Sequence, residues 1–168
     1  MAEELAYGRV LLKLSGEALM GDKGFGLDPD TLASTAADIA AAVEAGGRLG
    51  IVIGGGNIFR GLSSTAKGMD RIAADSMGML ATVINAMALT EALKGAGVKA
   101  VAMSAVPAGL AVKVFDHEEA NRLLDEGVVV VFGAGTGLPY FTTDTASSLR
   151  AVQIKAQAIF KMTKVDGV

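Results

Sequence analysis

The sequence predicts an α/β fold, a mostly parallel sheet with helices on both faces that forms an αβα sandwich. Strand-length runs of Val, Ile and Leu alternate with segments of helical pattern along the chain. Several runs are continuous in these residues, as in parallel strands that are covered on both faces. The 22 glycines suit the many strand-to-helix turns of such a fold. Ligands of these folds bind beyond the carboxyl ends of the strands.

Five apolar runs are predicted as strands: residues 9–14, 49–53, 99–103, 128–132 and 158–163. The first helix follows the first strand, where Asp28 can act as N-cap and Pro29 occupies the first helical position. Gly46 and Gly47 can end that helix. A last helix is expected over residues 146–154, after a Thr- and Asp-rich segment.

Residues 69–94 predict one long helix with many Met, Leu and Ile side chains. Its apolar surface is too wide for a single stripe facing one core. Burial within one subunit is one explanation. We prefer burial between the sheet and a partner subunit, which predicts an isologous dimer through this helix.

Composition narrows the class of protein. A chain of 168 residues fits one domain, spanning residues 1–168. A net charge of −3 argues against a broad nucleic-acid surface, and the absence of cysteine excludes disulfides and thiolate catalysis. No apolar run reaches membrane-spanning length and the N-terminus is acidic, so we expect a soluble cytoplasmic protein. The chain ends abruptly after a strand, which suggests that a C-terminal part is missing.

Three glycine-bearing loops follow predicted strands: LLKLSGEAL (residues 11–19), IVIGGGNIFRG (51–61) and GAGTGLPYFTTDT (133–145). Such loops let backbone N–H groups and helix N-termini face an anion. Three of them at one sheet edge suggest two phosphorylated ligands side by side, and hence phosphoryl transfer. With a phosphate monoester as acceptor, no proton-abstracting base is needed.

Five charged or polar residues are candidates for this chemistry. Lys13 at a strand end can place a positive charge against phosphoryl oxygens, although a solvated lysine is the simpler explanation. Arg60 can fork onto a phosphate. Asp75 either accepts from ribose hydroxyls or is an ordinary acid near a helix start. Asp144 can orient Lys13 or a water on Mg²⁺, while Thr142 and its neighbours can simply cap the helix.

The remaining candidates have simpler explanations. His117 is predicted at the surface near a helix start, without a role. Arg150 and Lys155 are predicted as solvated helix charges or interface groups. Tyr140 and Phe141 could form the wall of a base site or a packed aromatic pair.

At these motifs, together with the segment DSMGMLAT (75–82) and TKVDGV (163–168), the chain closely resembles bacterial UMP kinases of the amino acid kinase superfamily. The resemblance implies the reaction ATP + UMP → ADP + UDP with Mg²⁺, in a hexamer built as a trimer of dimers. It also implies GTP as activator and UTP as inhibitor, with residues 21–26 linked to the GTP effect.

The resemblance carries roles onto individual residues. It implies a catalytic group of Lys13, Arg60 and Asp144. It implies ATP contacts at Lys13, Leu14, Ser15, Gly16, Gly56, Arg60 and Thr163. It implies UMP contacts at Gly55, Asp75, Thr136, Gly137, Leu138, Pro139, Tyr140, Phe141, Thr142 and Thr143. No side chain is assigned as a metal ligand.

Two departures from the family pattern stand out. Leu138 occupies a position where many members have Asn, so base recognition must depend on backbone groups, Thr136 and shape. Members also continue beyond TKVDGV into most of the adenine site, so we expect this chain to bind UMP and to phosphorylate poorly. Two alternatives remain open: a non-catalytic nucleotide-binding fragment, and another superfamily enzyme acting on a carboxylate or carbamate.

Overall fold

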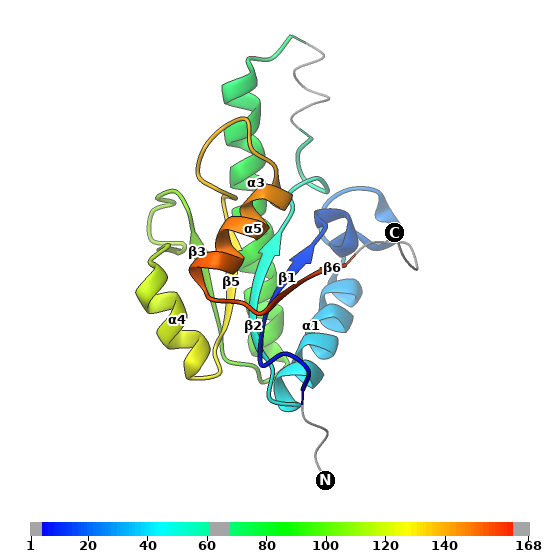
Figure 1. The fold of residues 1–168 in the computed structure, drawn as a ribbon. Coiled ribbons are helices and arrows are strands. Elements are labelled where there is room, and N and C mark those ends of the chain that lie inside the picture. The colour runs from blue at the N-terminus through cyan, green and yellow to red at the C-terminus, as the bar shows by residue number, and fades with distance from the viewer. Residues whose placement is uncertain (1–4, 61–67, 163–168) are drawn as a thin grey trace.

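The computed structural model describes residues 5–60 and 68–162, which form one fully parallel sheet of six strands in the order β4-β3-β5-β2-β1-β6 (Figure 1). The strands are β1 (Arg9–Leu14), β2 (Arg48–Ile53), β3 (Ala100–Ser104), β4 (Lys113–Val114), β5 (Val129–Gly133) and β6 (Ala158–Met162). The helices are α1 (Pro29–Glu44), α3 (Arg71–Gly95), α4 (His117–Asp125) and α5 (Thr143–Gln153), with short 3₁₀ turns η1 (Gly16–Leu19) and η2 (Gly21–Lys23).

The sandwich prediction is confirmed by two separate apolar cores, one on each face of the sheet. Residues of α1 and α3, including Ile39 and Leu89, pack with Ile51 in one core. Residues of α4 and α5, including Leu124 and Ala151, pack in the other. The four inner strands β1, β2, β3 and β5 are therefore largely covered on both sides, which is why their sequences are rich in apolar residues. The edge strands β4 and β6 are mostly exposed.

The five predicted strands are present, and no strand begins or ends more than one residue away from its predicted position. The prediction missed β4, which is only two residues long and carries no apolar run. Thr163, expected at the end of the last strand, lies outside the described residues.

Helix ends follow the predicted capping chemistry at α1. The Asp28 carboxylate accepts from Thr31 N at 3.0 Å, and Gly46 after the helix has φ 96°. The hydrogen bond from Lys23, with those from Thr31, lowers the pKa of Asp28 to about 2.

The prediction for the last helix was wrong at its start, because α5 begins at Thr143 and not at residue 146. Thr142 is the N-cap, and its hydroxyl oxygen accepts from Thr145 N at 3.2 Å. Asp144 therefore lies in the first helical turn. There a carboxylate is favoured by the helix dipole.

The long helix α3 starts two positions later than predicted, after the N-cap Asp70, and its N-terminal part projects beyond the carboxyl edge of the sheet (Figure 1). By length and composition alone α3 could cross a membrane. Its inner face is instead buried against the sheet, where Leu89 and Leu93 are fully covered. Its outer face leaves Leu80 and Ile84 half exposed.

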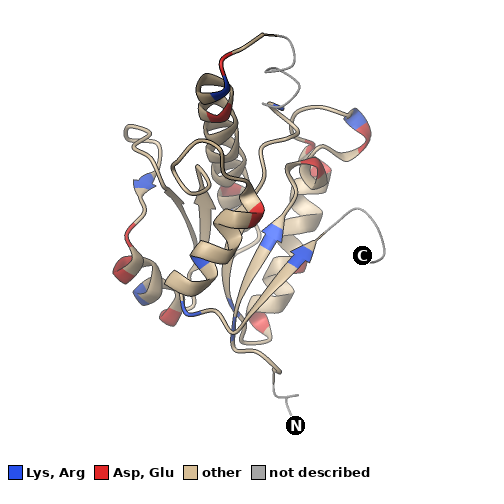
Figure 2. Cartoon of the chain, turned by 45° about the horizontal axis from the view of Figure 1, so that its top comes forward, with Lys and Arg blue, Asp and Glu red and all other residues tan. Residues whose placement is uncertain are grey.

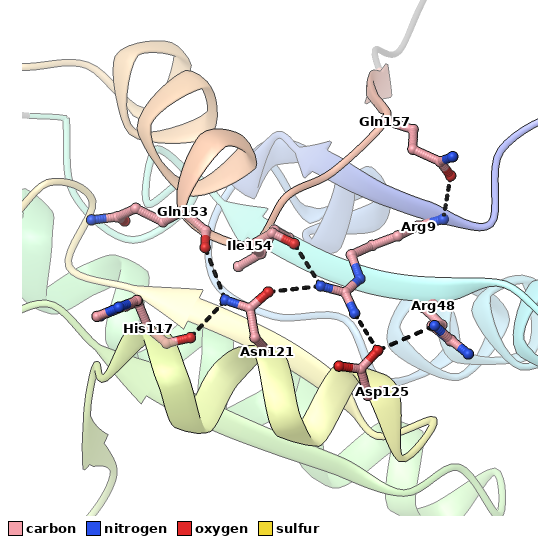
Figure 3. Close-up of polar contacts among 8 residues, drawn as sticks. All are labelled: Arg9, Arg48, His117, Asn121, Asp125, Gln153, Ile154 and Gln157. Carbon is pink, nitrogen blue, oxygen red and sulfur yellow. Dashed lines mark hydrogen bonds and ion pairs between the residues drawn. The ribbon is translucent and has the colours of Figure 1, made fainter.

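A polar network fastens the amino edge of the sheet, where strands β1 and β2 begin (Figure 3). The Arg9 guanidinium donates to Asn121 Oδ1 at 2.7 Å, to the Ile154 carbonyl at 2.8 Å and to Asp125 Oδ1 at 2.6 Å. Asn121 in turn donates to the Gln153 carbonyl at 2.9 Å. This network gives partners to the last carbonyls of α5 and holds α4, α5 and β1 together.

Candidate functional site

A cavity of about 210 Å³ opens at the carboxyl edge of the sheet, between the projecting part of α3 and the loops that follow β2 and β5. Seven of the ten residues predicted to bind UMP line it: Gly55, Asp75, Thr136, Leu138, Phe141, Thr142 and Thr143. Gly137, Pro139 and Tyr140 belong to the same loop but do not line the cavity. The position agrees with the general rule for ligands of parallel sheets.

The cavity also has lining residues to which no individual role was assigned. Five of them lie within the quoted motifs, Phe59, Gly78, Met79, Thr82 and Gly135, and two lie outside them, Arg71 and Ala74. Arg71 is the functionally notable member because it adds a positive charge to the cavity wall. Its spacing of four residues before Asp75 is a helical ion-pair signal that sequence reasoning could have used.

Asp75 faces the cavity from the second turn of α3 and is held at two points. Arg71 Nε donates to its carboxylate oxygens at 2.9 and 2.8 Å, and the backbone N–H of Tyr140 donates to Oδ2 at 2.7 Å. Desolvation acts to raise the pKa of Asp75, but the hydrogen bonds from Tyr140 and Arg71 outweigh it and the pKa is lowered. The carboxylate is therefore ionised and oriented across the cavity toward the loop after β5.

The loop after β5 has an unusual backbone. Ala134 and Tyr140 both have positive φ, at 61° and 69°, and so do Gly135 at 56° and Gly137 at 82°. Positive φ is strained for residues with a side chain, so surrounding contacts must hold the loop in place. One such contact is the hydrogen bond from Ala134 N to Thr82 Oγ1 at 2.7 Å.

A second part of the site is a charge cluster at the ends of β1 and β6. The parallel register places Lys13 directly beside Lys161 on the neighbouring strand. Their ammonium groups contact the two oxygens of Asp144, with distances of 3.0 Å from Lys13 Nζ to Oδ1 and 3.1 Å from Lys161 Nζ to Oδ2. Figure 2 shows basic positions near the carboxyl ends of these two strands and an acidic position at the start of α5.

The Asp144 carboxylate lies between two lysines, so the cluster holds two positive charges and one negative charge. Like charges side by side on adjacent strands repel, and the Asp144 carboxylate neutralises part of that repulsion. The hydrogen bond from Lys13 is the main cause that lowers the pKa of Asp144, against the opposing effect of desolvation and with help from Lys161. The predicted pairing of Lys13 with Asp144 is thus present, and Lys161 is a member that the sequence reasoning missed.

Arg60 and Glu17 form a third charged pair at the same edge. The Arg60 guanidinium contacts the Glu17 carboxylate, and Arg60 Nε donates to the Gly56 carbonyl at 3.2 Å. Glu17 follows Ser15, whose hydroxyl oxygen accepts from Glu17 N at 3.3 Å as N-cap of η1. Arg60 is exposed at the cavity rim and does not line it.

Two glycines of the first two loops, Gly16 and Gly55, are required for packing. A Cβ on Gly16 would lie 2.5 Å from Asn57 Oδ1 and 2.6 Å from the Gly54 carbonyl oxygen. A Cβ on Gly55 would meet the Gly78 carbonyl oxygen at 2.9 Å. Positions 16 and 55 therefore have to be glycine, because any side chain there would keep the strand ends and α3 from approaching so closely. At Gly56 the space is open, with Glu17 Oε1 3.9 Å away, which leaves room beside the backbone.

A buried amide pair supports the loop from behind. Asn85 Nδ2 donates to the Gly54 carbonyl and to Asn57 Oδ1, both at 2.7 Å. Asn57 Nδ2 donates at 2.7 Å to the carbonyl of Gly26, in the segment 21–26 that the resemblance links to GTP. Both side chains are almost fully buried, so the pair fixes the loop after β2 against α3.

The prediction that Arg150 is a solvated charge was wrong, because its residue is only 3% exposed. Its guanidinium lies 3.9 Å from the centroid of the Phe115 ring, and burial lowers its pKa. The residues next to Arg150 in the sequence, Leu149 and Ala151, do not indicate that its charged side chain faces inward. His117 and Lys155 are exposed, as predicted.

Among the described residues, no three His, Cys, Asp or Glu side chains gather into a metal-binding group. This part of the chain therefore offers isolated carboxylates, such as Asp144, beside the expected phosphates. That donor set fits Mg²⁺ carried by a nucleotide, since Mg²⁺ keeps several waters and takes one or two carboxylates.

Comparison with known proteins agrees with the fold. The model of the amino acid kinase family matches residues 8–168. The uridylate kinase of Porphyromonas gingivalis is 55% identical over 163 residues, which are 97% of this chain and 68% of that protein. The uridylate kinase of Saccharophagus degradans is 51% identical over 162 residues, 96% of this chain and 66% of that protein.

Solved structures give the same result. The UMP kinase of Bacillus anthracis superposes with a TM-score of 0.91 at 38% identity, over 96% of this chain and 67% of that one. The UMP kinase of Ureaplasma parvum superposes with a TM-score of 0.89 at 35% identity, over 95% and 68%. This chain thus spans about two thirds of the length of these relatives. It belongs to the amino acid kinase family and, within it, to the uridylate kinases.

Proposed function

We propose that this protein transfers the γ-phosphoryl group of ATP to UMP, giving ADP and UDP. The observation that carries the proposal is the position of two adjoining subsites on α5. Thr142 and Thr143 line the cavity at the start of the helix, and the next residue, Asp144, holds Lys13 and Lys161. A phosphate in the cavity would therefore lie next to the lysine cluster.

In this proposal UMP occupies the cavity. Asp75 accepts hydrogen bonds from the ribose, and the Thr142 and Thr143 hydroxyls with the N-terminus of α5 bind the acceptor phosphate. Leu138 contributes an apolar contact to the base and no hydrogen bond from its side chain, so uracil is recognised through backbone groups, Thr136 and shape. Phe141 adds an aromatic side chain to the cavity wall.

The donor phosphates occupy the edge formed by Leu14, Ser15, Gly16 and Gly56, with Lys13 and Arg60 as the cations. The acceptor phosphate is itself the nucleophile, so catalysis consists of positioning the two nucleotides and neutralising charge on the transferred group. Asp144 keeps Lys13 and Lys161 in place until the donor arrives. Mg²⁺ carried by ATP would supply further charge neutralisation, and Asp144 would be the carboxylate that holds it.

The first test is calorimetric titration of the chain with UMP, with CMP and dTMP as controls, together with UMP-dependent formation of ADP from ATP and Mg²⁺. Selective binding of UMP is the expected result. A folded chain that binds none of the three nucleotides would refute the acceptor site and favour a non-catalytic fragment. Phosphorylation of a carboxylate or carbamate in place of UMP would favour another enzyme of the family.

The proposal extends to assembly and regulation. The outer face of α3 exposes Ile72, Met77, Leu80 and Ile84, at 44 to 51% of their surface, and we assign this face to an isologous dimer within a hexamer. Sedimentation or light scattering over a range of concentrations tests it, and a monomer mass at every concentration would refute it. GTP activation, UTP inhibition and a cytoplasmic location are further parts of the proposal, and titration with each nucleotide tests the first two.

A further inference from the structure

Arg150 is a buried cation without a carboxylate partner in the described part of the chain. Only 3% of the surface of Arg150 is exposed. None of the ion pairs in residues 5–60 and 68–162 includes it. Its Nε atom is buried and has no hydrogen-bond partner within residues 5–60 and 68–162. Burying an unpaired charge is costly, so contacts of another kind must repay it.

Those contacts are aromatic rings on one side and a loop carbonyl on the other. The guanidinium carbon lies 3.9 Å from the centroid of Phe115 and 5.9 Å from that of Phe132, which favours a cation over the ring faces. Arg150 Nη1 donates to Gln153 Oε1 in its own helix, and Nη2 donates to the Gly135 carbonyl at 3.1 Å. The last bond crosses from α5 to the loop that walls the cavity.

The loop after β5 is held at three points, and Arg150 supplies the one from α5. Thr82 on α3 accepts from Ala134 N, and Asp75 on α3 accepts from Tyr140 N. Between them the Gly135 carbonyl accepts from Arg150. Ala134, Gly135, Gly137 and Tyr140 all have positive φ, so the loop needs these anchors to keep its conformation.

We propose that Arg150 is a positioning residue of the UMP site: through the Gly135 carbonyl it holds the loop 134–140 in the conformation that receives the nucleotide. The inference rests on the proposed function for the identity of the ligand. Its conformational part concerns the loop alone and is open to a test without ligand. Arg150 touches neither the cavity nor the lysine cluster, so it acts through the loop and not on the reacting atoms.

The test compares Arg150→Met with the unsubstituted chain by amide hydrogen exchange and by UMP titration. Methionine keeps an unbranched apolar chain over the rings and removes the hydrogen bonds. The Gly137 and Tyr140 amides, which donate to the Ala134 carbonyl and to Asp75, should exchange about tenfold faster, and UMP affinity should fall by about tenfold. Amides of the central strand β5 should exchange at an unchanged rate.

Arg122→Met, on the exposed surface of α4, is the matched control and should change neither measurement. If Arg150→Met does not fold, Arg150→Lys replaces it, because lysine keeps the charge and most of the stem but lacks the planar fork whose Nη1 and Nη2 reach Gln153 and Gly135 separately. A folded variant whose loop amides exchange at an unchanged rate would overturn the inference. Amide exchange that became faster by the same factor throughout the sheet would also overturn it, because that is the result expected if Arg150 only stabilises the fold. If the unsubstituted chain binds no UMP, the proposed function fails, while the exchange result still decides the role of Arg150.

Discussion

The two edges of the sheet both join basic residues to an aspartate, but they differ in what the cations are bonded to. At the amino edge, Arg9 donates to a backbone carbonyl and a side-chain amide as well as to Asp125. At the carboxyl edge, Lys13 and Lys161 contact a single carboxylate, that of Asp144, which is 57% exposed. The partners of Arg9 are structural groups of the fold, whereas the Asp144 carboxylate could be replaced at the lysines by another anion.

This difference separates a structural cluster from a functional one. The bonds of Arg9 to Asn121 and Ile154 satisfy groups at the end of a helix, and a ligand that took the guanidinium would leave them unpaired. An ammonium group carries three donors and no fixed plane, so Lys13 can keep Asp144 and contact a phosphate oxygen too. The carboxyl edge is therefore the edge that can respond to a ligand.

The largest expected effect is on phosphoryl transfer and comes from Lys13→Met. Removing one preorganised cation from the transferred group should lower the rate of UMP-dependent ADP formation about 10²- to 10³-fold, measured at saturating nucleotides. Stability should change little, because the substitution also removes the repulsion between Lys13 and Lys161. Lys155→Met at the amino edge is the control and should leave the rate unchanged; an equal loss there would end the distinction between the edges.

The next effect is on stability and comes from Arg9→Met. Losing the bonds to Asn121, Ile154 and Asp125 should lower the free energy of unfolding by about 2–3 kcal/mol, as for hydrogen bonds to a charged group that is largely covered. UMP affinity should stay the same. Arg48→Met tests the distinction further. The half-exposed Arg48 guanidinium pairs with Asp125 alone in the described part of the chain, so this substitution should lower the free energy of unfolding in urea by under about 1 kcal/mol.

The same contrast explains what could be predicted from the sequence. Continuous apolar runs identified the four inner strands that were predicted, because burial on both faces favours apolar residues there. The edge strand β6 was predicted from the same kind of run, although it is mostly exposed. The N-cap Asp28 and the glycines after α1 act locally and were predictable for that reason. The strand β4 was missed because two residues carry no periodicity, and α5 was predicted to start too late because Thr142, not a later residue, is its cap.

The site was predictable where it lies in loops and less so where it depends on register. The cavity residues from Thr136 to Thr143 follow one strand, and their neighbours in sequence are neighbours in space. Lys161 enters the cluster only because β6 pairs with β1 in a register that aligns it with Lys13. Arg150 resembles any surface arginine of a helix until the rings of Phe115 and Phe132, from two other segments, are placed beside it.

A smaller effect is expected within the cavity, from Asp75→Asn. The amide can still accept from Tyr140 N but loses the charge that pairs with Arg71 and that favours ribose hydroxyls as donors. UMP should bind about tenfold more weakly in calorimetry. Asp70→Asn is the control, because asparagine caps a helix as well as aspartate does, and it should leave UMP binding unchanged. Equal affinity for UMP in the Asp75→Asn chain would remove Asp75 from the binding site.

The smallest effect concerns pH and the lysine cluster. The pKa of Asp144 is lowered in the folded chain, mainly by the hydrogen bond from Lys13, so its ionised form stabilises the fold. That contribution is fully present above the ordinary carboxyl value of 3.8 and is lost as the pH falls through the lower folded value. Between pH 7 and pH 5 the substitution Asp144→Asn should therefore reduce the free energy of unfolding by a constant amount, under about 1 kcal/mol because the carboxylate is mostly exposed. Below pH 4 the difference between the two chains should shrink. Urea unfolding at pH 7, 5, 4 and 3 measures it, and a difference that grew on acidification would mean that the lysines gain nothing from Asp144 at this edge.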